Sequence, residues 1–178
     1  MKPLTSAIAA LVLGLAVLVS AGAFAGPAPT ADRAHSADHA HGFERFLQQY
    51  EAANSAFVNG NPSPWLSITV EKDPASIFGG FGGPGDAGVA KVRQRYLLAA
   101  SAFRPSGAQV DFEYLVKDVR GRLAYTVAIE RANVLYAEQT KRQQQVLRAT
   151  MIFRFEDGAW KIVHRHADTM VNLQLPTP

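Results

Sequence analysis

The stretch from Leu147 to Asp168 is LRATMIFRFEDGAWKIVHRHAD, and it carries the clearest fold signal in the chain. Apolar and polar residues alternate on both sides of Asp157-Gly158, which is the pattern of half-buried β-strands. An Asp-Gly pair between two such runs is a strong hairpin signal. The sequence therefore predicts an antiparallel hairpin with strands at 147–155 and 160–171.

Two further alternating runs precede this hairpin, at 110–116 and 123–136. Upstream of them the apolar spacing changes to three and four residues, at 43–57 and again at about 88–103, which is the period of an amphipathic helix. Two helices followed by four long strands indicate an α+β domain with the helices on one face of an antiparallel sheet. The glycine-rich segment at 79–85 lacks the Gly-Lys-Ser/Thr ending of a phosphate-binding loop and predicts a tight turn.

The hairpin also predicts which side chains share a face. A type I turn with Gly158 in a bulge places Thr150 opposite His164 and Arg148 opposite His166, and a turn centred near Gln139 places Glu130 opposite Arg148. A slip of one residue would move every side chain of a strand to the other face, and the alternative register pairs Met151 with His164. The favoured register predicts a polar pocket wall, with Ala124, Thr126 and Ala128 beside it, made of Glu130, Arg148, Thr150, His164, His166 and Asp168.

With these residues on its last strands, the chain resembles the SnoaL-like branch of the nuclear transport factor 2-like superfamily, which includes the ketosteroid isomerases. The resemblance covers about 43–170 and is most specific in DGAWKIVHRH at 157–166. It implies a cone in which a curved antiparallel sheet wraps around N-terminal helices and encloses a pocket, usually in a homodimer. The superfamily contains isomerases, cyclases, dehydratases and non-catalytic assembly or transport domains, so the fold alone does not imply a function.

The first functional hypothesis is a pocket that binds a small molecule bearing a carbonyl or carboxylate group. Arg148 would anchor a carboxylate, because a guanidinium binds that group through two parallel hydrogen bonds. Thr150, Asp168 and Thr126 are predicted to contact the same ligand.

Two other hypotheses stay open. In the first, the domain is a cofactor-independent isomerase or lyase, similar to a ketosteroid isomerase or a dehydratase or cyclase, in which His164, His166 or Glu130 transfers a proton. No Tyr/Asp pair matches the oxyanion hole of the isomerases. In the second, the domain is a non-catalytic structural homodimer and both histidines only satisfy buried polar groups. We expect no metal at the His-x-His pair.

The N-terminus predicts export. Lys2, an apolar run at 7–19 and Ala23-Phe24-Ala25 have the order of a signal peptide at 1–25, so we expect a periplasmic or secreted protein without membrane attachment after cleavage. Residues 26–42 are rich in His, Asp, Pro and Ala and predict a flexible leader. The SnoaL-like domain is expected at 43–172, followed by a C-terminal tail at 173–178.

Composition excludes several other functions. The 178-residue chain has no cysteine, so disulfides and cysteine-bound metals are excluded, and we expect no cofactor. The net charge of +3 is small and the basic residues are scattered, which argues against a nucleic-acid partner. Apolar residues on both faces of the predicted sheet, such as Tyr125, Val127 and Ile129, predict a homodimer.

Overall fold

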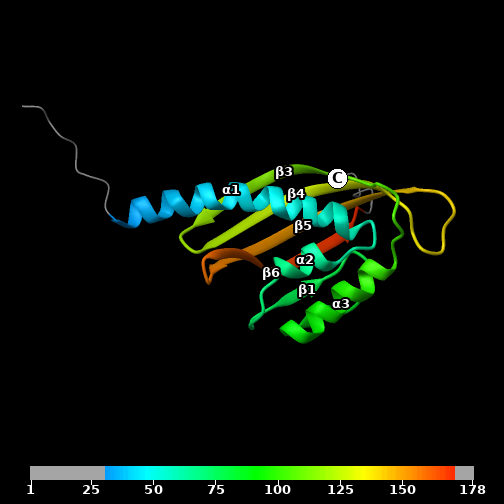
Figure 1. Cartoon of the computed structure of the whole chain (residues 1–178), viewed down its shortest axis with the longest axis horizontal. Helices are drawn as coiled ribbons and strands as arrows, with labels where there is room; N and C mark the ends of the chain where they lie inside the picture. The colour runs from blue at the N-terminus through cyan, green and yellow to red at the C-terminus, as the bar shows by residue number, and fades with distance from the viewer. Residues whose placement is uncertain (1–30, 171–178) are drawn as a thin grey trace, which may run out of the picture.

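A curved, open sheet carries helices on one side in the computed structural model, which describes residues 31–170 (Figure 1). The sheet order is β2-β1-β6-β5-β4-β3, and β1 runs parallel to β6 while the other neighbours are antiparallel. The elements are α1 (Ala31–Phe57), α2 (Ser63–Ser67), β1 (Ser76–Phe78), β2 (Asp86–Ala87), α3 (Val89–Ser101), β3 (Val110–Arg120), β4 (Leu123–Val134), β5 (Gln143–Glu156) and β6 (Ala159–Thr169). The α+β architecture expected from the sequence is confirmed.

The long helix α1 lies across the concave face of the sheet (Figure 1). Its predicted apolar stripe is buried, since Phe43, Phe46, Leu47 and Tyr50 are all at most 5% exposed. The three aromatic rings pack against Phe153 of β5, with the ring centre of Phe43 5.2 Å from that of Phe153. The helix begins at Ala31, earlier than the predicted domain start, so part of the predicted leader is helical.

The hairpin between β5 and β6 exists, but its predicted register is wrong. Asp157 and Gly158 both have positive φ, 50° and 81°, and form a two-residue turn that pairs Glu156 with Ala159. Such mirror-image turns match the right-handed twist of the strands. An irregularity between Ile152 and Phe153 then shifts the pairing further, so that Thr150 faces His166 rather than His164.

The register between β4 and β5 is also shifted, by one residue. Glu130 pairs with Leu147 instead of Arg148, and Ile129 takes the place opposite Arg148. The apolar pattern explains this, because Leu147, Ala149, Met151 and Phe153 are at most 6% exposed and must face the inner side of the sheet. One residue of shift therefore places Glu130 on the inner face of the sheet and Arg148 on the outer face.

The predicted signal peptide at 1–25 and the C-terminal tail at 173–178 lie outside the described residues. Within residues 31–170, none of the helices combines the length and the apolar character needed to span a membrane.

Candidate functional site

A buried ion pair lies on the inner face of the sheet, between Glu130 of β4 and Arg165 of β6. Two parallel hydrogen bonds join them, from Nη1 to Oε1 at 2.8 Å and from Nη2 to Oε2 at 2.6 Å. The side chains are only 4% and 10% exposed. The Tyr50 hydroxyl of α1 donates a third hydrogen bond to Glu130 Oε1 at 2.8 Å. The guanidinium carbon of Arg165 lies 5.4 Å from the centre of the Trp65 ring, within the range of a cation–π contact.

This geometry keeps both partners charged. Burial raises the pKa of Glu130, but the attraction of Arg165 and the hydrogen bonds from Arg165, Tyr50 and Asn54 outweigh burial and leave the pKa below its ordinary value. Burial lowers the pKa of Arg165, and the nearby Glu130 carboxylate reverses that effect and raises it. The Tyr50 hydroxyl stays protonated, because burial and the neighbouring Glu130 raise its pKa well above the ordinary value.

Three buried donors around this ion pair have no hydrogen-bond partner of normal geometry among the described residues. They are Asn54 Nδ2 of α1, Trp65 Nε1 of α2 and the Tyr96 hydroxyl of α3. Asn54 is close enough to Glu130 to lower its pKa, and Trp65 is close enough to Tyr96 to lower that of the phenol, yet neither approach meets full hydrogen-bond geometry. Burial is the larger influence on Tyr96 and raises its pKa to about 12. All three residues are at most 4% exposed, so water cannot reach them freely.

These donors line a cavity of about 300 Å³ between the sheet and the helices. The ion pair also lines it, so the cavity has a polar inner end at Asn54, Trp65, Tyr96, Glu130 and Arg165. The remaining wall is largely aromatic and aliphatic. It includes Phe57, Val58, Ile77, Phe81, Phe103, Val110, Ala132 and Leu147.

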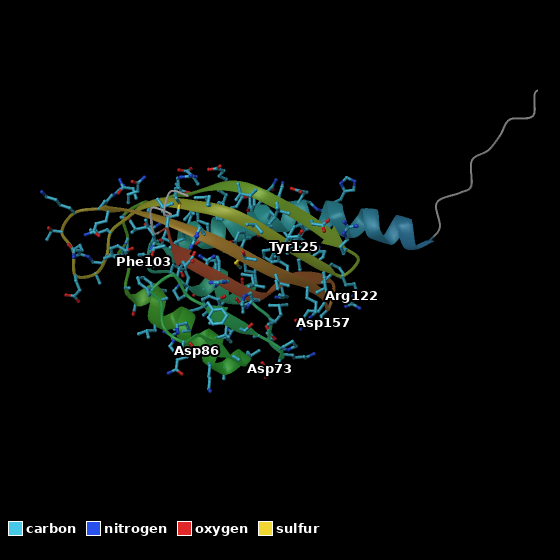
Figure 2. The ribbon with its side chains drawn as sticks, turned by 180° about the vertical axis from the view of Figure 1, so that it is seen from behind. Asp73, Asp86, Phe103, Arg122, Tyr125 and Asp157 are labelled. Carbon is cyan, nitrogen blue, oxygen red and sulfur yellow. The ribbon has the colours of Figure 1, made fainter. Side chains whose placement is uncertain are left out.

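The glycine-rich segment forms part of the rim of this cavity. Phe81 is 55% exposed, and its ring lies 5.8 Å from Phe103 and 6.2 Å from Tyr136. Phe103 itself lies between the end of α3 and the loop after β4 (Figure 2). Gly80 approaches Leu147 so closely that an added Cβ would lie 3.1 Å from it. The predicted tight turn is therefore the place where the chain passes close to the inner sheet face.

The structure divides the predicted polar wall between the two faces. Glu130 and Thr126 lie on the inner face and are buried, although Thr126 does not line the cavity. The other members lie on the outer face, which Figure 2 shows in front of α1, with Tyr125 labelled on the same face. They are Arg148, Thr150, His164, His166 and Asp168.

On that outer face, Arg148 and Asp168 form an ion pair with contacts of 3.0 Å and 2.6 Å. Both lie with Thr150 and His166 around an open hollow of about 290 Å³. The hydrogen bond from Arg148 lowers the pKa of Asp168; burial opposes this shift, and the charges of Arg148 and His166 add to it. Arg148 therefore already has a carboxylate partner, which leaves its predicted role as a ligand anchor a prediction.

The two histidines of β6 both lie beside the Phe78 ring but differ in burial and in hydrogen-bond partner. His164 Nδ1 lies 2.8 Å from Ser76 Oγ of β1, and its pKa is lowered by burial and by the repulsion of His166. His166 is exposed, and its ring lies 5.2 Å from the ring of Phe78. Neither lies on the inner face with Glu130, so the proton-transfer set predicted from the sequence is not assembled at one site.

The residues that line the inner cavity were largely missed by the sequence prediction. Arg165 lies between the two histidines in the sequence, and the favoured register had placed its side chain on the outer face. The sequence held a signal for its position, because Arg165 pairs with Met151, which belongs to the more apolar of the two alternating sets of residues in β5. Asn54, Trp65 and Tyr96 come from three separate helices, and no spacing in the sequence links them.

Comparison with solved structures shows the same fold. A candidate dehydratase of the NTF2-like family from Streptomyces avermitilis is 19% identical, with a TM-score of 0.58 over 72% of this chain and 95% of that one. A candidate scytalone dehydratase from Novosphingobium aromaticivorans is 16% identical, with a TM-score of 0.58 over 78% and 88%. A nuclear transport factor 2 superfamily protein from Salmonella enterica is 13% identical, with a TM-score of 0.59 over 82% and 97%.

At these identities the structures show a shared fold and nothing finer. A search of curated proteins found no match to the chain. The family described as the SnoaL-like domain, in contrast, matches residues 47–172, which include every strand and most of the cavity wall. The chain therefore belongs to the SnoaL-like domain family.

Proposed function

We propose that the inner cavity binds a small, mainly apolar molecule through a neutral acceptor oxygen, such as a ketone carbonyl. The observation that carries this proposal is the set of three buried donors without partners, Asn54, Trp65 and Tyr96, all of which line one cavity. Buried polar groups in proteins are nearly always hydrogen-bonded, so unpartnered donors in a cavity wall indicate a missing acceptor.

The charges around the inner end favour a neutral oxygen there over a carboxylate. Both terminal nitrogens of Arg165 are bound by Glu130, so the guanidinium has no free fork for an incoming anion. Glu130 stays ionised and would repel a second carboxylate beside it. A carbonyl oxygen instead accepts from the phenol, indole or amide donors without adding charge to the site.

Binding is better supported than turnover. A general acid or base works best when its pKa lies near the working pH. The pKa of Glu130 moves down and that of Tyr96 moves up to about 12, so both move away from neutrality. Isomerisation or dehydration is the alternative use of the same cavity, and a reaction there would need the bound molecule itself to shift one of these values.

Nuclear magnetic resonance with acetophenone, a neutral aryl ketone, tests the proposal. Millimolar acetophenone should shift the amide signals of residues around Tyr96, Asn54 and Leu147, and leave those around Thr150 on the outer face unchanged. Replacing Ala99, which lines the cavity on α3, by Leu should reduce the affinity because the added side chain occupies the cavity. Gln94→Leu, on the exposed side of the same helix, should leave it unchanged. Shifts only on the outer face, or none at all, would contradict the proposal.

We also propose that the protein is exported and forms a homodimer through the outer face of the sheet. Four exposed apolar side chains on this side support the dimer: Leu115, Leu123, Tyr125 and Ile152, which are 38–59% exposed. N-terminal sequencing of the mature protein should begin at Gly26, after the predicted cleavage site. Light scattering of the purified protein should give twice the mass of the mature chain, and Ile152→Asp should halve it.

A further inference from the structure

A second arginine, Arg95 of α3, lines the same cavity beside the glycine-rich rim. It directly precedes Tyr96, whose side chain is 2% exposed, whereas the Arg95 side chain is 30% exposed. The cavity therefore has a buried end near Tyr96 and a solvent-reachable cation at its rim.

Among residues 31–170, only the Nε edge of the Arg95 guanidinium has a hydrogen-bond partner. Its Nε donates to Asp86 Oδ2 of β2 at 2.6 Å. The Nη1 and Nη2 ends point toward Gly83, where an added Cβ would lie 4.0 and 3.9 Å from them. Gly83, next to the lining residue Gly82, has a φ of 96°, a backbone conformation that favours glycine, so no side chain covers the guanidinium there. Because Arg95 lines the cavity and its side chain is 30% exposed, a ligand oxygen can reach its terminal donors.

The two arginines of the cavity differ in what they can still bind. Arg165 gives both terminal nitrogens to Glu130 at the inner end, while Arg95 keeps both available at the rim. A guanidinium with two free parallel donors is suited to a carboxylate. An anionic group would therefore be attracted to the rim and repelled from the inner end, where Glu130 lies.

We infer that the natural ligand is bipolar, with a carboxylate bound by Arg95 at the rim and a neutral acceptor oxygen at Asn54, Trp65 and Tyr96. An apolar body, such as an aromatic ring, occupies the aromatic wall between the two ends. This inference rests on the proposed function and adds the class and the orientation of the ligand. Arg95 is then the residue that selects an acid over the neutral analogue.

Isothermal titration with 4-acetylbenzoate and 4-acetylbenzamide tests the inference, because the two probes differ in charge and hardly in shape. The wild-type protein should bind the benzoate more tightly than the amide. Arg95→Met should weaken benzoate binding roughly 10- to 100-fold, the range for losing a charge-assisted hydrogen bond, and change amide binding less than about twofold. Arg148→Met, on the outer face, is the control and should alter neither.

Asp86→Asn provides an opposite change at the same place. Removing the carboxylate that competes for Arg95 should strengthen benzoate binding several-fold, on the order of a nearby unit charge in a solvated site. Equal binding of the two probes by the wild type, or no response of benzoate to either variant, would overturn the inference. If acetophenone binds and 4-acetylbenzoate does not, the inference of a bipolar ligand also fails, but the proposed binding of a neutral acceptor oxygen in the cavity is kept. If acetophenone does not bind, the proposed function itself has failed.

Discussion

Each face of the sheet carries an ion pair between an arginine and a carboxylate, and the inner pair is buried while the outer pair is exposed to solvent. On the inner face Arg165 forms an ion pair with Glu130, and their side chains are 10% and 4% exposed. On the outer face Arg148 forms an ion pair with Asp168, and their side chains are 57% and 44% exposed. Both pairs have two short contacts; the inner pair joins β4 and β6 across β5, and the outer pair joins the neighbouring strands β5 and β6. The contact geometry alone therefore does not tell which pair matters to the protein. Burial does, since a buried charge without a partner is costly and an exposed one is solvated by water.

The largest expected effect comes from breaking the inner pair on one side. Glu130→Gln leaves the Arg165 charge buried without its counter-charge, and we expect a loss of about 3 to 5 kcal/mol in the free energy of unfolding, measured by urea titration. Asp168→Asn makes the same chemical change on the outer face and should leave the urea midpoint where it is. Equal effects of the two variants would remove the distinction between the faces.

Removing the inner network as a whole should cost far less than breaking it. The triple variant Tyr50→Phe, Glu130→Leu and Arg165→Met leaves no orphaned charge and no unpaired tyrosine hydroxyl, so its stability should lie within about 2 kcal/mol of the wild type. The comparison is the urea midpoint of the triple variant against Glu130→Gln. A triple variant less stable than the single one would mean that the ion pair itself, rather than its incompleteness, dominates.

The inner pair should also give the protein an acid sensitivity that the triple variant lacks. The pKa of folded Glu130 lies below its ordinary value of 4.5, so unfolding takes up protons between the two values. The stability from this group is complete above the unfolded pKa and is lost as the pH falls through 4.5 toward the folded value. Urea titrations at several pH values should therefore show the wild type losing more stability below pH 4.5 than the triple variant.

The smallest effect is expected at Arg148. Its side chain is solvated, so Arg148→Met should leave both the urea midpoint and the affinity for acetophenone unchanged. A clear loss of ligand affinity in this variant would move the binding site to the outer hollow.

The sequence was sufficient for the two long helices and the four long strands, but it missed α2, β1 and β2 and did not settle which face of the sheet is buried. The apolar stripe of α1 and the alternation on either side of Asp157-Gly158 are local patterns, and both predicted the observed structure. Which face is buried depends on the turn type and on one irregularity near Ile152, and each of these changes the pairing of the whole strand. Comparing the two alternating sets of residues in β5 would have predicted the buried face, because Leu147, Ala149, Met151 and Phe153 form the more apolar set.

The cavity donors were beyond the sequence for a different reason. Asn54, Trp65 and Tyr96 are ordinary helix residues, and each lies on the buried side of its own helix. Only the packing of α1, α2 and α3 on the sheet brings them to one cavity. A donor without a partner is a property of the folded chain and has no local pattern.

Tyr96→Phe tests most directly whether the buried donors are kept for a ligand, because this change removes the unpartnered hydroxyl and keeps the ring. If the hydroxyl is kept for a ligand, the variant without ligand should be as stable as the wild type or more stable by up to about 1 kcal/mol, since an unpaired buried hydroxyl is unfavourable. Its affinity for acetophenone should fall about 2- to 10-fold, the range for a neutral hydrogen bond. A variant that loses more than about 1 kcal/mol of stability and binds acetophenone as the wild type does would show that the hydroxyl serves folding, and would contradict the account.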